Sequence, residues 1–201
     1  MLLPQVESIK EIIKYDLEPS LYSFYFLENL IDYLNSKEIE KHPCHFKINT
    51  GLNRVGFNEK ESEKAINKIK NCNAIKLVSI YSHLAATDDS QESNFTISQI
   101  NLFKEISSNI KSQLSYSPIL HMSNTSGIYN YPDCEFDMVR AGIGLYGYNN
   151  ELNKELRPVH TLKSIIAQII EAKSGDSIGY NRAFFCEEQI RVGVIPLGHA
   201  D

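Results

Sequence analysis

The sequence predicts an α/β fold, a partial (β/α)8 barrel of the TIM type followed by the start of a β-rich domain. Up to about residue 150, segments with a helical spacing of apolar residues alternate with short apolar segments, which is typical of a parallel sheet covered by helices. After that point, strand-like segments follow one another with turn residues and no helix between them. We therefore expect two domains, residues 1–152 and 153–201.

Three helices are expected in the first domain. Apolar residues at three- and four-residue steps predict helices over 21–34 and 97–114, and the charged segment 59–71 has one apolar side. Thr96 and Gln99 have the spacing of a capping box, so the third helix is expected to begin at Thr96.

Strands are expected to alternate with these helices. In the first domain, one strand is expected to end near Asn49, and three others are expected over 75–83, 118–122 and 139–146. In the second domain, strands are expected over 161–170, 177–180 and 190–197. Because the carboxyl ends of parallel barrel strands meet at one rim, the polar residues that follow them are expected to form the functional site.

The composition excludes several classes of function. A net charge of −5 argues against a nucleic-acid or anionic-membrane partner. The most apolar run, 165–170, is too short to span a bilayer, and no signal peptide is recognisable. The four cysteines are scattered without a Cys-x-x-Cys pair, so we expect reduced thiols, no metal site and a cytoplasmic protein.

Five residues follow or end the predicted strands of the first domain. Arg54 lies between two glycines after the first complete strand, His83 ends the second, Asn124 and Thr125 follow the third, and Arg140 lies on the fourth. An arginine in such a loop offers a planar fork to a carboxylate or phosphate. Taken singly, each residue could serve a structural role, but their joint placement at one rim favours a site.

Residues 45–57 read His-Phe-Lys-Ile-Asn-Thr-Gly-Leu-Asn-Arg-Val-Gly-Phe. This segment resembles the His-Leu-Lys-Ile-Asp-Thr-Gly-Met-Asn-Arg-Leu-Gly-Phe motif of alanine racemases, pyridoxal-phosphate (PLP) enzymes of fold type III, and further motifs of that family follow in the same order. Further similar segments are 81–89, 121–127, 136–147, 177–182 and 195–201. The resemblance implies interconversion of L- and D-alanine through a PLP aldimine by two-base proton transfer, in a homodimer that supplies D-alanine for peptidoglycan.

The resemblance also implies a role for each matching residue. Tyr180 aligns with the base that removes the α-proton of L-alanine, and Arg140 aligns with the arginine that binds the pyridine nitrogen of PLP. His83 aligns with a histidine that links these two residues. Arg54 aligns with an arginine near the substrate carboxylate.

Other matching positions concern the cofactor phosphate and a modified lysine. Asn124, Thr125, Gly142 and Ile143 are assigned to cofactor binding, where a hydroxyl and backbone N–H groups would hold the phosphate. Lys47 aligns with a lysine that is carbamylated in some members, although an inward lysine could equally form a plain ion pair.

The sequence departs from the family pattern at three positions and lacks one motif. Asn49 replaces aspartate, Thr125 replaces serine and His199 replaces tyrosine. The family's Schiff-base lysine lies in a Lys-Ala-Asn-Ala-Tyr-Gly motif that is absent, and the sequence stops as a strand ends at Asp201. We therefore expect an internal fragment, inactive on its own, of a longer racemase. Residues 15–23 resemble the subgroup fused to a cell-wall peptide ligase.

Four alternatives remain open from the sequence. A PLP racemase for serine or for a broader range of substrates fits the same motifs. A basic-amino-acid decarboxylase of this architecture is disfavoured by Arg140, because those enzymes place an acidic residue at the pyridine nitrogen. A non-catalytic PLP-binding barrel protein is disfavoured by Tyr180 and the β-rich domain. The chain could also be one subunit of a split racemase.

Overall fold

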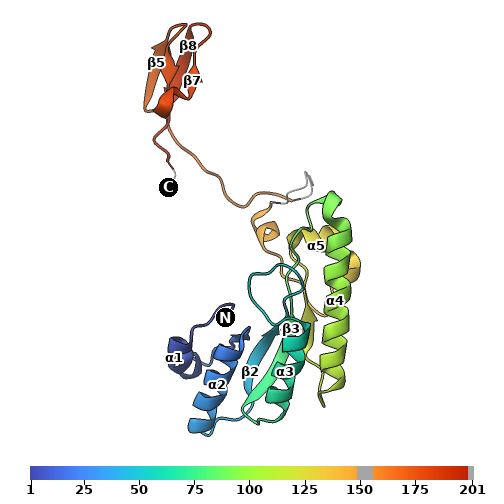
Figure 1. Ribbon diagram of the computed structural model, residues 1–201. Coiled ribbons are helices and arrows are strands. Elements are labelled where there is room, and N and C mark those ends of the chain that lie inside the picture. The colour runs from blue at the N-terminus through green and yellow to red at the C-terminus, as the bar shows by residue number, and fades with distance from the viewer. Residues whose placement is uncertain (149–155, 199–201) are drawn as a thin grey trace. The chain divides into compact units, whose positions relative to one another are not determined.

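The computed structural model describes residues 1–148 and 156–198. It divides into two compact units, Met1–Arg157 and Pro158–Asp201, which are described separately (Figure 1). The domain boundary expected at 152/153 and the departure at His199 both lie outside the described residues.

The first unit is built on a parallel four-stranded sheet with the order β1-β2-β3-β4. The strands are β1 (Ser20–Leu21), β2 (His42–Lys47), β3 (Ile75–Tyr81) and β4 (Ile119–His121). The α-helices are α1 (Ile9–Lys14), α2 (Phe24–Ser36), α3 (Glu59–Lys70), α4 (Ser93–Ser112) and α5 (Thr125–Asn130). Neighbouring strands are joined by a helix, as in one section of a (β/α) barrel, which confirms the predicted fold class.

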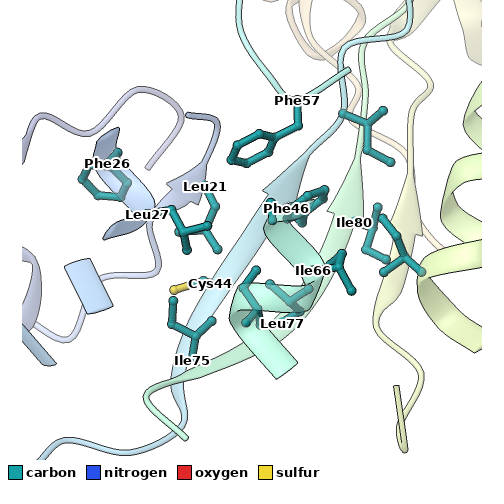
Figure 2. Close-up of a cluster of buried hydrophobic side chains, with 14 of the residues drawn as sticks. Leu21, Phe26, Leu27, Cys44, Phe46, Phe57, Ile66, Ile75, Leu77 and Ile80 are labelled. Carbon is teal, nitrogen blue, oxygen red and sulfur yellow. The ribbon is translucent and has the colours of Figure 1, made fainter. Parts of the chain in front are cut away.

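The core lies between the sheet and the helices that cover it, as Figure 2 shows. Phe46 of β2 stacks on Phe57 with ring centroids 5.0 Å apart, and Phe57 meets Phe24 edge to face at 5.2 Å. Leu27 of α2 and Ile66 of α3 are fully buried in the same cluster. These contacts hold the β2–α3 loop against the sheet, which positions the residues that follow β2.

Helix α3 confirms the helix predicted over 59–71, with an N-terminal signal that the prediction did not use. The Asn58 side chain accepts a hydrogen bond from the Glu61 N–H, and the Glu61 carboxylate accepts one from the Asn58 N–H, both at 3.0 Å. This capping box satisfies two backbone donors at the start of the helix. Ala65 and Ile66 are among its buried residues.

Helix α4 begins at Ser93, so the capping box predicted at Thr96 and Gln99 was wrong. Both side chains lie inside the helix and bind the preceding loop: Thr96 Oγ1 donates to the Ala86 carbonyl at 3.3 Å, and Gln99 Oε1 accepts from the Ala85 N–H at 3.0 Å. Both side chains are buried, and their hydrogen bonds tie α4 to the loop that follows β3.

The segment 139–146 is not a strand, contrary to the prediction. Met138 forms a single parallel bridge with His121, and the Arg140 N–H donates to the Ser123 carbonyl at 3.0 Å. The backbone then turns into a 3-10 helix, Ile143–Tyr146. Pairing with the end of β4 therefore stops at Arg140, and the residues after it are free to approach the α5 loop.

The second unit contains two antiparallel pairs. β5 (Gln168–Ala172) pairs with β8 (Ile190–Val194), and β6 (Ser177–Ile178) pairs with β7 (Phe184–Phe185). The β5–β6 turn uses Gly175 at a φ of +89°. The predicted strands 177–180 and 190–197 are thus confirmed in shorter form, whereas 161–170 is a strand only from Gln168 onward.

Candidate active site

A cavity of about 360 Å³ lies at the carboxyl ends of the parallel strands in the first unit. Each strand contributes to its wall at or near its end. The lining residues include Ser20, His45, Lys47, Arg54, Tyr81, His83, His121, Met138 and Arg140. The edge of the sheet where barrel enzymes bind their ligands is therefore hollowed in this chain.

The lining carries three cationic side chains, and no carboxylate is among the described residues that line it. Lys47 is 3% exposed, and burial, followed by the charges of Arg140 and Arg54, lowers the pKa of its amine to about 7. A buried cation such as Lys47, with two further cations near it and no acidic partner among the described lining residues, raises the free energy of the empty site. The cavity is therefore suited to an anionic ligand.

Arg140 is held in place by acceptors from the ends of β3 and β4. Its Nη2 donates to the Ser82 carbonyl at 2.7 Å, to the Met122 carbonyl at 3.2 Å and to His83 Nδ1 at 3.2 Å. Its Nη1 donates to His121 Nδ1. Because a guanidinium has only donors, both histidines must present an unprotonated Nδ1.

The electrostatics of these histidines agree with that geometry. Burial, followed by the charge of Arg140, lowers the pKa of His83 to about 4 and that of His121 to about 3. Both imidazoles are therefore neutral near pH 7, and each can accept from the guanidinium without adding a further charge.

Tyr81 forms a platform beneath the cations. Its ring stacks on His121 with centroids 5.0 Å apart, Lys47 Nζ lies 4.7 Å from the ring centre, and Arg140 Cζ lies 5.4 Å from it. Its hydroxyl shares a 2.7 Å hydrogen bond with Ser20 Oγ. The electron-rich face of the ring offsets part of the cost of placing two cations in a buried site.

The loop at the start of α5 is fixed by a network around Asn124. Asn124 Oδ1 accepts from the Gly127 N–H and from Thr87 Oγ1, both at 2.9 Å. Thr125 Oγ1 accepts from the Gly144 N–H at 3.0 Å, and a Cβ on Gly144 would lie 2.8 Å from Thr125 Cγ2. Only glycine permits this close approach of the two segments.

Gly142 and Ile143 belong to the same cluster. A Cβ on Gly142 would lie 3.9 Å from Thr125 Oγ1, and Ile143 begins the 3-10 helix that carries Gly144. The structure thus brings together Thr125, Gly142 and Ile143, which were assigned to phosphate binding, with Asn124, which was assigned to cofactor binding.

Arg54 lies in the β2–α3 loop, and Asn49 shapes that loop. Asn49 Oδ1 accepts from the Gly51 N–H at 3.2 Å and from the Asn53 N–H at 3.0 Å. An asparagine oxygen can accept both bonds as an aspartate would, so the substitution at Asn49 keeps the loop-forming contacts while removing a charge.

Tyr180 belongs to the second unit, in a turn that follows Gly179. Its side chain is 96% exposed, and Gly179, Asn181 and Arg182 all have positive φ. The tyrosine is therefore presented on a tight turn of its own unit.

Sequence reasoning did not assign Tyr81, His121 or His45 to the site, although each lies within a motif that it used. The available signal was position, since Tyr81 and His121 are the final residues of β3 and β4. Ser20, in the short strand β1, lies within residues 15–23, but that resemblance concerned a subgroup of the family and did not indicate a site residue.

Comparison with known proteins gives a family match for each of the two units. The model of the alanine racemase N-terminal domain matches residues 1–150, and that of the alanine racemase C-terminal domain matches residues 159–201. The alanine racemase of Treponema denticola is 33% identical over 206 residues, covering 99% of this chain and 54% of that protein.

Solved structures of alanine racemases are also similar to this chain. An alanine racemase of Clostridium difficile 630 aligns with 29% identity and a TM-score of 0.78, covering 100% of this chain and 54% of the other. An alanine racemase from Bartonella henselae with covalently bound pyridoxal phosphate aligns with 26% identity and a TM-score of 0.75, covering 99% and 54%. The chain spans about half the length of the curated relatives that it matches. Its motifs, its strand-end cavity and both domain matches show that it belongs to the alanine racemase family.

Proposed function

We propose that this chain supplies cofactor- and substrate-binding residues of an alanine racemase that interconverts L- and D-alanine with PLP. The observation that carries the proposal is the Arg140 guanidinium, fixed at the strand ends by neutral acceptors. In the same proposal the racemase is a cytoplasmic homodimer and supplies D-alanine for peptidoglycan. No helix within residues 1–148 and 156–198 is long and apolar enough to cross a membrane.

The residues present fit PLP in charge. The cofactor carries a phosphate and a phenolic oxygen, and the cavity carries cations without a lining carboxylate among the described residues. The Thr125 hydroxyl and the backbone at Gly142 and Ile143 would hold the phosphate, with Asn124 fixing their loop. Arg140 would meet the pyridine nitrogen. The Schiff-base lysine motif is absent from this sequence, so the chain offers the non-covalent part of such a site.

Bound PLP would acidify the α-proton of the amino acid and stabilise the resulting negative charge. Arg140 cannot give up a proton at neutral pH, so it would keep the pyridine nitrogen unprotonated while donating a hydrogen bond to it. Such a nitrogen withdraws less charge than a protonated one, which favours return of the proton over side reactions. His83, neutral and bound to Arg140, would help to orient the guanidinium.

Tyr180, as a phenolate, would take the α-proton of L-alanine at its phenolic oxygen. A phenolate is a weak base towards a C–H bond, so this step also depends on the acidified substrate. The base acts across the subunit interface of the dimer in this proposal, and the exposed position of Tyr180 in its own unit supports that reading. Arg54 would bind the substrate carboxylate as a planar fork.

We also propose that Lys47 is the site of a carbamate. With a pKa of about 7, a large fraction of the amine is neutral near pH 7 and can attack carbon dioxide, forming an N–C bond and releasing a proton to water. The resulting anion would relieve the repulsion that Arg54 and Arg140 exert on the lysine.

Carbamylation is testable by 13C NMR with labelled bicarbonate. We expect a carbamate signal that grows as pH rises through about 7, because only the neutral amine reacts. Lys47→Arg should abolish the signal, whereas Lys76→Arg, at an exposed lysine of β3, should leave it unchanged. A signal that survives Lys47→Arg would contradict the assignment.

The proposed activity is testable in a chimera. Because the match covers 54% of the T. denticola enzyme, the uncovered segments of that enzyme can be joined to this chain. We expect the chimera to form D-alanine from L-alanine only when PLP is present, and chiral chromatography would measure the D-alanine. Formation of D-serine without D-alanine would favour the serine racemase. A folded, PLP-loaded chimera inactive on all amino acids would favour the non-catalytic alternative.

A further inference from the structure

A series of hydrogen bonds runs from Arg140 through the sheet to a carboxylate at the protein surface. Arg140 Nη1 meets His121 Nδ1, and His121 Nε2 lies 3.0 Å from Ser79 Oγ. Ser79 Oγ lies 2.7 Å from His45 Nδ1, and His45 Nε2 lies 2.9 Å from the Glu18 carboxylate. The series connects β4, β3 and β2 with the segment that precedes β1.

The direction of every bond in this series follows from its two ends. Arginine has only donors, so His121 Nδ1 accepts and its remaining proton must be on Nε2. That N–H donates to Ser79 Oγ, and the serine hydroxyl then donates to His45 Nδ1. His45 carries its proton on Nε2 and donates it to the Glu18 carboxylate, which has only acceptors when ionised.

The middle of the series is shielded from water, whereas its end is not. Ser79 is 3% exposed and His121 is 5% exposed, whereas the Glu18 side chain is 48% exposed. Hydrogen bonds in series strengthen one another in a medium of low polarity. The series cannot carry a proton to Arg140, because a guanidinium has no free lone pair to receive it.

We propose that Glu18, His45 and Ser79 are positioning residues that act on Arg140 through the tautomer of His121. The Glu18 carboxylate keeps the His45 proton on Nε2, so the Ser79 hydroxyl donates to His45 Nδ1. The serine oxygen is then left to accept from His121 Nε2, and the lone pair on His121 Nδ1 faces the Arg140 guanidinium. Without this arrangement, His121 could present an N–H to Arg140, and the guanidinium would lose an acceptor. The expected effect on catalysis rests on the proposed function, in which Arg140 faces the cofactor. The expected histidine tautomers do not depend on the proposed function.

The tautomers are testable by 15N NMR of the imidazoles in this chain, without cofactor. We expect His121 and His45 to be neutral with protons on Nε2 near pH 7. Glu18→Ala should shift the His45 and His121 nitrogen signals, whereas Glu18→Gln, which keeps an accepting oxygen, should retain both tautomers. The matched control is Glu28→Ala, because Glu28 is also a half-exposed carboxylate, paired with Lys68 at 2.8 Å.

A His121 proton on Nδ1, or His121 signals unaffected by Glu18→Ala, would overturn the proposal. Ser79→Ala is a second test, because it removes the buried hydroxyl between His45 and His121. If Ser79→Ala does not fold, the Glu18 variants at the surface still test the proposal. In the chimera, Glu18→Ala should lower the rate of racemisation about threefold to thirtyfold, and Glu18→Gln should restore most of it. Equal rates in Glu18→Ala and the unaltered chimera would also overturn it. If the tautomers are as expected but the unaltered chimera does not bind PLP, the result would count against the proposed function and not against the positioning residues.

Discussion

Tyr180→Phe is expected to lower D-alanine formation from L-alanine by about 10²- to 10⁴-fold in the chimera, the range contributed by a positioned acid or base. The change removes only the phenolic oxygen that would accept the α-proton. Tyr180 is 96% exposed in its own unit, so little loss of stability is expected. The measurement is the initial rate of racemisation together with exchange of the α-hydrogen in deuterated water.

The control for this variant is Tyr25→Phe. Tyr25 is also exposed, at 68%, and lies on α2. We expect it to leave both rates unchanged and PLP absorbance to be equal in the two variants. If Tyr180→Phe racemised alanine in both directions as fast as the unaltered chimera, another group would have to remove the proton of L-alanine.

The largest effect on stability is expected for Phe46→Ala. Phe46 is fully buried and stacks on Phe57, and replacing a buried phenylalanine by alanine costs about 3–5 kcal/mol. This loss is a large fraction of the stability of a single domain. Urea denaturation followed by circular dichroism would measure it as a lower midpoint.

A matched variant separates burial from loss of an aromatic ring. Phe184 is 55% exposed in β7, so Phe184→Ala should change the free energy of unfolding by less than about 1 kcal/mol. Equal destabilisation by the two variants would mean that Phe46 does not pack in the core as described.

The predictions that succeeded rest on local periodicity. Helix α3 has its apolar side at helical steps and its charges outside, so pattern alone located it. β3 was located in the same way, as an apolar run between turn residues. Because such strands were expected in one parallel sheet, the position of His83 at its rim could be anticipated; Arg140 reaches the same rim although its segment is not a strand.

The errors arose where long-range contacts decide the structure. The sequence around Val139 has the apolar residues of a strand, but the chain leaves β4 after Arg140 and turns at Ile143. Thr96 and Gln99 have cap spacing, but the loop after β3 recruits both side chains. His45 and Ser79 were missed for the same reason, since only the folded sheet makes them neighbours.

The contact between Thr125 and Gly144 couples the residues that the two positions can hold. A Cβ at residue 144 would meet the threonine methyl at 2.8 Å but the hydroxyl oxygen at 3.2 Å. A serine at 125 has no methyl, so with serine present an alanine at 144 would need only a small adjustment. With Thr125 in place, alanine at residue 144 is therefore sterically disfavoured, and an alanine there would first require serine at 125.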